Sequence, residues 1–214
     1  MFCAAAMTLA GYLAYEFGYW LDHYLKHKVP FFWAFHKVHH SADSLSPLTN
    51  FRVHPIDSIV FYNIVALLLG STEALVNHAF GHPTAPFNIW GRNILLLAGA
   101  ILLTHLQHTH LWLSFTGRIG KLILSPAHHQ IHHSMNPAHY DRNFGSTLAV
   151  WDLLFGTLYV PSKRREKLSF GVEGLGYDPH TAKGGLLMPL TDAWVEIRPL
   201  PKVGRPRLRP VRQD

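Results

Sequence analysis

Residues 20–40 read Trp-Leu-Asp-His-Tyr-Leu-Lys-His-Lys-Val-Pro-Phe-Phe-Trp-Ala-Phe-His-Lys-Val-His-His. This stretch contains a histidine pair four residues apart and then a histidine triplet with spacings of three and four, and the triplet recurs about 90 residues later. The three groups hold eight histidines: His23, His27, His36, His39, His40, His129, His132 and His133. Helical residues three and four positions apart share one face. Each group therefore predicts a helix that presents two or three imidazoles to a common point.

Histidine is the outstanding feature of the composition, with 17 of 214 residues, whereas Asp, Glu, Lys and Arg together make up 15%. Imidazole is the commonest metal ligand in proteins, and burying many unpaired imidazoles together costs solvation free energy without structural benefit. One tetrahedral zinc ion takes about four ligands, so eight histidines predict two metal ions. An all-nitrogen ligand set suits Fe, Zn, Cu or Ni.

Several classes of protein are excluded by the same sequence. The single cysteine, Cys3, cannot form an internal disulfide, so this is not a disulfide-stapled secreted module. An apolar content of 48% excludes a mainly disordered chain. The absence of an H-E-x-x-H motif disfavours a zinc protease of that type. The absence of any E-x-x-H pair excludes the carboxylate-rich di-iron bundle.

Three stretches carry no formal charge, at residues 1–15, 58–72 and 93–117. A helix needs about 20 mostly apolar residues to cross a bilayer. We therefore predict membrane-spanning helices at about residues 1–20, 56–76 and 89–106. The mean hydropathy of the chain is only +0.07, so a soluble protein with buried core helices remains an alternative.

The predicted spans fix a topology, because the second and third would form a hairpin that returns the chain to its starting side. All the histidine groups then lie on one side, together with Lys26, Lys28 and Lys37. The positive-inside rule makes that side cytoplasmic. We expect an all-α fold, in which multi-pass membrane helices carry a cytoplasmic helical cap that holds a histidine-rich dimetal site.

The net charge of +6 belongs to the C-terminal part of the chain. Residues 1–160 hold 8 basic and 7 acidic residues, whereas residues 161–214 hold 11 and 6. We predict a membrane-embedded domain over residues 1–160 and a basic tail over residues 161–214. The tail suits an anionic membrane surface, and a merely solvated tail is the alternative. No nucleic-acid-binding motif accompanies it, so nucleic acid is not an expected partner.

The histidine groups and their flanking residues resemble the fatty acid hydroxylase/sterol desaturase superfamily of integral-membrane, histidine-box di-iron oxygenases. The resemblance covers roughly residues 16–161. The segments that carry it are Trp20–His27, Pro30–Ser41, His108–Leu111, Ser125–Ser134, His139–Gly145 and Trp151–Thr157. Members usually carry additional membrane helices before the first box, so we expect N-terminal helices to be missing here.

The resemblance implies a membrane non-haem di-iron oxygenase that hydroxylates or desaturates a lipid such as a fatty acyl chain or a sterol. Two Fe²⁺ ions would use O2 as co-substrate. Electrons would come from an external donor, cytochrome b5 or a ferredoxin with an NAD(P)H reductase, because the chain has no nucleotide-binding glycine motif. The alternatives are a membrane zinc-dependent hydrolase, a non-catalytic protein that binds or transports metal, and a truncated member that binds metal without turnover.

The resemblance also ranks the candidate site residues. The eight box histidines and His108 are the expected metal ligands. Six further residues are expected as metal ligands or as groups that orient the ligands: His105, His110, His139, Glu16, Asp141 and Asp152. The three carboxylates are equally well explained as helix caps or surface groups. His128 is displaced from the face of its triplet, His54 is expected in a structural loop role, and His78, His82 and His180 fall outside every motif. The sequence does not identify substrate-binding residues.

Overall fold

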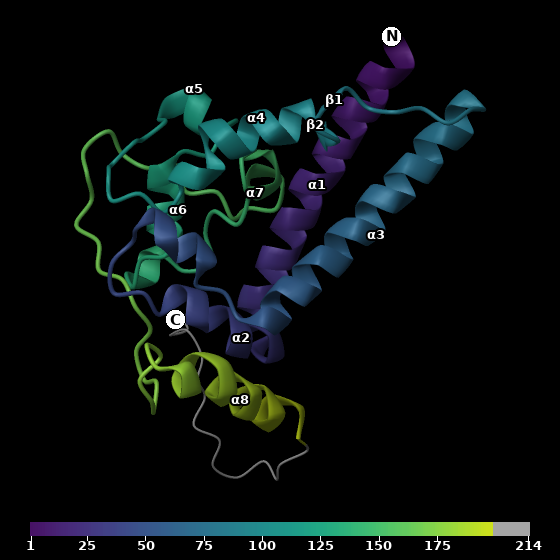
Figure 1. Cartoon of the computed structure of the whole chain (residues 1–214). Coiled ribbons are helices and arrows are strands. Elements are labelled where there is room, and N and C mark those ends of the chain that lie inside the picture. Colours follow the sequence, from purple (N-terminus) through teal and green to yellow (C-terminus); the bar gives the residue numbers. More distant parts are fainter. Residues whose placement is uncertain (199–214) are drawn as a thin grey trace.

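The computed structural model describes residues 1–198, so residues 199–214 of the predicted basic tail lie outside the described part. The described chain is mostly helical, which confirms the predicted helical class, although two short strands form a small hairpin (Figure 1). Its elements are α1 (Phe2–Lys28), α2 (Pro30–His40), η1 (Pro47–Phe51), α3 (Pro55–Phe80), β1 (Asn88–Ile89), β2 (Arg92–Asn93), α4 (Ile94–Leu102), η2 (Thr104–Leu106), α5 (Gly117–Gly120), α6 (Pro126–His132), η3 (Pro137–His139), α7 (Val150–Leu154), η4 (Lys183–Leu187) and α8 (Met188–Ile197).

Proline sets the boundary between the first two helices. The residue before a proline disfavours the helical region, and Val29 accordingly has φ −102° and ψ 112°. Pro30 is then the first residue of α2, where its missing N–H has no helical partner to lose. The turn brings the histidine pair at the end of α1 close to the triplet at the end of α2.

Helices α1 and α3 run side by side in opposite directions and form the longest contact of the fold (Figure 1). Gly18 lies at this contact, and a Cβ atom there would come within 3.0 Å of Leu68 Cδ1. A larger residue would therefore have to displace the Leu68 side chain. Below this point α1 carries its histidines toward α2 and α6.

The structure corrects the predicted set of membrane spans. Within residues 1–198, α3 is the one helix long and apolar enough to cross a bilayer, and its apolar side chains are mostly exposed. The predicted span at 89–106 is not a continuous helix. It begins with the turn between β1 and β2, where Trp90 and Gly91 have positive φ, and α4 starts only after this turn. Helix α4 has nine residues, about 14 Å at 1.5 Å per residue. The first predicted span is helical, but α1 continues to Lys28 and buries Glu16, Asp22 and Lys26.

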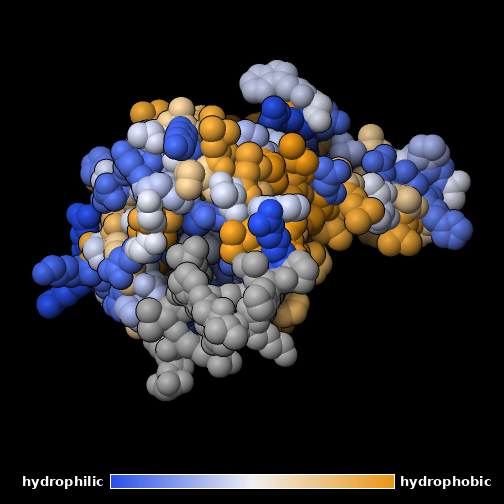
Figure 2. Space-filling model, turned by 90° about the horizontal axis from the view of Figure 1, so that it is seen from below, coloured by the Kyte–Doolittle hydropathy of each residue, from blue (hydrophilic) through white to orange (hydrophobic). Residues whose placement is uncertain are grey.

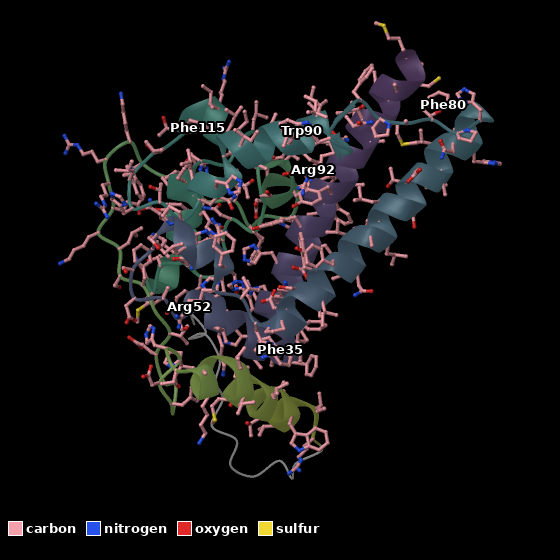
Figure 3. All side chains as sticks on the ribbon, in the orientation of Figure 1. Phe35, Arg52, Phe80, Trp90, Arg92 and Phe115 are labelled. Atoms are coloured by element: carbon pink, nitrogen blue, oxygen red, sulfur yellow. The ribbon has the colours of Figure 1, made fainter. Side chains whose placement is uncertain are left out.

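Helix α8 packs against α2, so the segment after residue 160 is not only a tail. Phe35 lies at this contact (Figure 3), in a small cluster with Ala34 and Ala193 against which Phe31 and Ile56 also pack. The cluster holds α2 in place from the side opposite α1. The division at residue 160 itself stays a prediction.

Candidate metal centre

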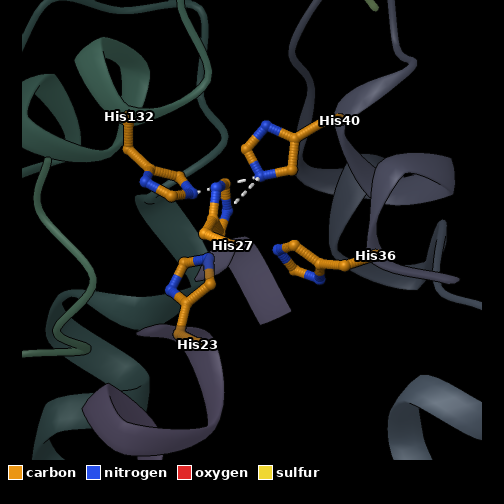
Figure 4. A group of neighbouring side chains, drawn as sticks. All are labelled: His23, His27, His36, His40 and His132. Carbon is orange, nitrogen blue, oxygen red and sulfur yellow. Dashed lines mark hydrogen bonds between the residues drawn. The ribbon is translucent and has the colours of Figure 1, made fainter. Parts of the chain in front are cut away.

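The nine predicted metal ligands lie together in two groups in the described chain. Within each group the candidate ligand atoms all lie within 4.8 Å of one another. We call the first group A; it contains His23, His27, His36, His40 and His132 (Figure 4). We call the second group B; it contains His39, His108, His129 and His133.

The helical spacing explains how one triplet serves two groups. The pairs His36/His40 in α2 and His23/His27 in α1 are four residues apart, and both pairs belong to group A. In α6 the pair His129/His133 belongs instead to group B. The remaining member of each triplet, His39 or His132, lies on the adjacent face and joins the other group. Helices α2 and α6 therefore each contribute to both groups.

The distances within group B indicate a cation. The Nε2 atom of His108 lies 3.0 Å from that of His39, 3.1 Å from that of His133 and 2.9 Å from that of His129. A single N–H proton can be shared with one of these neighbours, so the other contacts would bring lone pairs together. Nitrogens that bind one metal at about 2.1 Å lie about 3.0 Å apart when their bonds are at right angles.

The nitrogen positions in group A also fit a bound metal ion. His40 Nε2 lies 3.1 Å from the Nε2 atoms of both His27 and His132. The Nε2 atoms of His23 and His36 are buried and have no hydrogen-bond partner among the described residues. Buried polar atoms are rarely left without a partner. Both groups thus fit metal ions held by imidazole nitrogens.

Three outer nitrogens of group A have protein partners that fix the ring orientation. His23 Nδ1 lies 2.9 Å from the Phe144 carbonyl oxygen, and His132 Nδ1 lies 2.8 Å from that of Arg142. His36 Nδ1 lies 2.8 Å from Asp57 Oδ2. A proton on Nδ1 donates to each acceptor and leaves the Nε2 lone pair free for a metal.

Asp57 is the functional residue that sequence reasoning missed. It lies in the first turn of α3, is buried, and also forms an ion pair with Lys26. Lys26 in turn lies 2.6 Å from Asp22 Oδ2. The available signal was a charged residue directly before an uncharged stretch, but no spacing linked Asp57 to His36.

Burial favours the neutral form of six of these imidazoles by lowering their pKa values. It lowers the pKa of His108 to about 4 and the pKa of His132 to about 3. Burial, reinforced by neighbouring imidazoles, also lowers the pKa values of His39, His40, His129 and His133. The neutral form is the one that binds a metal, so the site is ready for metal at neutral pH.

The structure does not bring the other predicted histidines into either group. His105 and His110 are exposed on either side of His108. His139 is buried beside the Tyr159 ring, and its Nε2 atom lies 3.4 Å from Glu166 Oε2. None of these three residues belongs to group A or group B in the described chain.

None of the three predicted carboxylates has an imidazole among its hydrogen-bond partners in the described chain. Glu16 accepts hydrogen bonds from Thr147 N, Thr147 Oγ1 and Leu148 N at 2.8–2.9 Å. It therefore holds this loop to α1, and the expected contact with His23 is not among its hydrogen bonds. Asp141 instead pairs with Lys28 near the surface.

Asp152 supports the metal centre indirectly. It is fully buried and accepts hydrogen bonds from the backbone N–H groups of Phe144 and Gly145, both at 2.8 Å. The carbonyl of Phe144 is the partner of His23. A Cβ atom at Gly145 would lie 2.7 Å from Leu148 O, so the loop requires glycine at this position. Asp152 thus holds the loop that orients His23.

The histidines left out of the predicted ligand set have other roles. His128 Nδ1 accepts a hydrogen bond from Ser125 N at 3.0 Å and caps α6. His54 caps α3 by accepting from Ile56 N at 3.1 Å. His78, His82 and His180 are exposed. None of these five belongs to group A or B in the described chain.

A cavity of about 150 Å³ leads to the two groups. His27, His40 and His132 of group A and His133 of group B line it. Its other walls combine apolar and polar side chains, from α2, from residues 134–141 and from residues 171–175: Trp33, Lys37, Ser134, Met135, Tyr140, Asp141, Val172, Glu173 and Leu175. A small part of a larger molecule can therefore reach the imidazoles.

The fold and the site define a helical protein with two histidine groups that could hold metal ions. The chain belongs to the fatty acid hydroxylase family, whose model matches residues 8–157. This match confirms the superfamily that the histidine boxes indicated. Its named relatives are monooxygenases and hydroxylases, which are oxidoreductases.

Named relatives are similar to most of this chain. An alkylglycerol monooxygenase of Xenopus tropicalis is 29% identical over 164 residues, which are 75% of this chain and 32% of that protein. The ornithine lipid hydroxylase OlsE of Rhizobium tropici is 29% identical, over 79% of this chain and 46% of that protein. Human cholesterol 25-hydroxylase is 29% identical, over 70% and 50%. The chain thus spans a third to a half of these relatives. No solved structure matches it significantly.

Proposed function

We propose that this protein is a membrane-bound di-iron oxygenase that hydroxylates a lipid. The observation that carries the proposal is the gathering of nine imidazoles into two adjacent groups, eight of them buried and that of His27 half-buried, in a family whose named relatives are lipid hydroxylases and monooxygenases. Group A and group B would each hold one iron ion. When bound, the irons would supply the oxidation of an unreactive C–H bond with O2, chemistry that acid–base side chains cannot perform.

The residues of the chain hold and orient the metal centre. Phe144 O, Arg142 O and Asp57 keep three rings of group A in the tautomer that frees Nε2. The low pKa values of His108 and His132 keep these two ligands unprotonated at neutral pH. Helices α2 and α6 hold the two groups at a fixed separation because each contributes to both.

The cavity beside the imidazoles is where the reacting carbon of the lipid would lie. Trp33, Met135 and Leu175 supply apolar wall around it, whereas Lys37 and Glu173 offer polar contacts to a headgroup. The lipid tail would stay in the bilayer that α3 crosses. We place the histidines on the cytoplasmic side because the basic residues around them follow the positive-inside rule.

An oxygenase of this kind needs electrons from outside the chain. We infer a one-electron donor such as cytochrome b5 or a ferredoxin, served by an NAD(P)H reductase. Hydroxylation is preferred to desaturation because the named relatives are hydroxylases and monooxygenases. The lipid itself is an alkyl or acyl lipid or a sterol, the classes that the names of the relatives span.

The test uses the full chain in lipid nanodiscs, loaded with Fe²⁺ without oxygen and then supplied with a reductase system and a panel of alkylglycerols, amino-acid-linked lipids and sterols. We expect about two irons per chain, oxygen uptake, and a product heavier by one oxygen atom, labelled by ¹⁸O2. His110→Ala is the matched control for His108→Ala, since His110 is exposed in the same segment.

The outcomes separate the alternatives. Loss of product and of about one of the two irons in His108→Ala, with both irons and product retained in His110→Ala, supports the proposal. Turnover without oxygen, by a protein that holds zinc and not iron, would identify a hydrolase and reject it. Iron binding with no oxygen uptake on any lipid class would instead identify a non-catalytic metal-binding protein.

A further inference from the structure

Helix α8 exposes an apolar stripe on the side that faces away from α2. Its side toward α2 holds Asp192 and Ala193. Its outer side, the α8 apolar face, is formed by four residues that are 43–58% exposed: Leu187, Leu190, Trp194 and Ile197. A surface helix of a soluble protein buries its apolar stripe. An exposed apolar stripe indicates a binding surface.

Buried contacts fix the rotation of α8, so that the apolar face cannot turn inward. Lys37 is buried in α2, and its Nζ atom lies 2.5 Å from Asp192 Oδ2. The Tyr177 hydroxyl donates to the same carboxylate at 2.9 Å. Rotating α8 would leave Lys37 buried without its counter-charge, which is far more costly than exposing apolar side chains.

Two contacts place α8 at the level where α3 begins. His54 caps α3, and its Nε2 atom lies 3.0 Å from the carbonyl oxygen of Leu186, just before α8. Ile56, in the first turn of α3, packs against the cluster that contains Ala193 of α8. Because α3 is the described helix able to cross a bilayer, α8 lies near the membrane boundary.

The surface around α8 favours an anionic lipid partner over a neutral one. The guanidinium of Arg198 lies 4.9 Å over the Trp194 ring. The sequence that follows is basic, with Lys202, Arg205, Arg207, Arg209 and Arg212 against a single acid, Asp214. Apolar and aromatic residues beside such a cluster are typical of helices that lie on anionic membranes. The view from below, from the end at which α8 lies, shows a broad hydrophobic area (Figure 2).

We propose that α8 is an interfacial helix whose apolar face lies in the headgroup region of an anionic bilayer. The inference rests on the membrane placement in the proposed function and goes beyond it. Because Lys37 lines the cavity beside the imidazoles and holds α8 through Asp192, the docked helix would also keep that cavity close to the bilayer surface.

The test places a fluorescent label on a single cysteine in a Cys3→Ser background, in nanodiscs of phosphatidylcholine with and without phosphatidylserine. Leu190→Cys puts the label on the apolar face, and Lys163→Cys is the control on an exposed polar loop. We expect iodide to quench the Leu190 label at least about threefold less than the control label. Spin-labelled lipids should quench the Leu190 label instead, more strongly with phosphatidylserine and less at high salt.

Native Trp194 gives an independent reading without a label. Brominated lipids should quench more fluorescence in the wild type than in Trp194→Phe. Equal iodide quenching at Leu190 and Lys163, with no lipid quenching, would overturn the proposal. Shielding that persists in detergent and disappears on dilution would show a second copy of the chain on this face, which also overturns it. Lipid hydroxylation in the same nanodiscs reports separately on the proposed function.

Discussion

Asp57 provides the sharpest test of how this protein builds its metal centre. Its carboxylate accepts from His36 Nδ1 at 2.8 Å and pairs with buried Lys26. In Asp57→Asn the amide oxygen can still accept from His36, but the negative charge is lost. In Asp57→Ala the acceptor is lost too. Both variants leave every imidazole in place, so an effect on metal binding would come through orientation.

The expected magnitude follows from the loss of these contacts. Removing a group that orients a metal ligand weakens metal binding about 10–100-fold, which corresponds to about 1.4–2.7 kcal/mol. We expect Asp57→Asn near the lower figure and Asp57→Ala near the upper one. Both substitutions also leave Lys26 with Asp22 as its remaining counter-charge, so the fold should lose stability, but less than the about 3–5 kcal/mol expected when a buried charge loses its only partner.

The assay is competition for Fe²⁺ with a chelator of known affinity, together with thermal unfolding in detergent. Asp141→Asn is the matched control, since Asp141 pairs with partly exposed Lys28 and its positive φ suits asparagine. We expect the control to bind iron like the wild type. If Asp57→Asn folds and both it and Asp57→Ala bind iron as tightly as Asp141→Asn, the assignment of Asp57 as an orienting residue is refuted.

Three further results are expected. His108→Ala should lower the iron content from about two ions per chain to about one, because His108 Nε2 contacts every other member of group B. Substitution of the exposed His110 by alanine should leave the iron content unchanged, and equal iron content in the two variants would contradict the prediction. Glu16→Gln should lower the free energy of unfolding by about 1–3 kcal/mol, measured by denaturant unfolding, because an amide cannot accept all three hydrogen bonds that Glu16 accepts. The iron content should not change, and a loss of iron would show that Glu16 acts directly at the metal. The metal-free protein should lose stability as the pH falls from about 6.5 toward 4. Burial lowers the pKa of His108 in the folded protein to about 4, so the unfolded chain takes up a proton at a higher pH than the folded one. A melting temperature that does not change with pH over this range would contradict the prediction.

The metal ligands could be predicted from the spacing of the histidines, because this spacing depends only on helix geometry. Residues three and four apart share a face in any helix, so the eight box histidines were identifiable without knowing the packing. Their division between two groups depends on how α1, α2 and α6 meet, which the spacing does not contain. The orienting carbonyls of Phe144 and Arg142 belong to the backbone, which has no residue signature at all.

The membrane spans were less predictable because charge-free length is a weaker signal. The stretch at 93–117 is uncharged, but Trp90 and Gly91 form a turn before it and α4 ends at Leu102. Helix α1 shows the opposite effect, since it buries charged Asp22 and Lys26 by pairing them with each other and with Asp57. Counting charges cannot distinguish a buried, neutralised ion pair from one exposed to lipid.

The two groups differ in how firmly the protein holds their rings, and this predicts an order of metal loss. Group A has five imidazoles, and the Nδ1 atoms of His23, His36 and His132 have protein partners. Group B has four imidazoles, and the buried Nδ1 atoms of three of them have no hydrogen-bond partner in residues 1–198: His108, His129 and His133. Oriented ligands bind metal more tightly.

Limited chelation should therefore release one iron ahead of the other, and the first should come from group B. Wild-type protein should therefore lose iron to the chelator in a fast and a slow phase. In His129→Ala, which damages group B, the remaining iron should be released at the rate of the wild-type slow phase. In His40→Ala, which damages group A, any remaining iron should leave as fast as the wild-type fast phase. The reverse pattern, with the tightly held iron surviving in His40→Ala, would mean that hydrogen bonds to the outer nitrogens do not set metal affinity here.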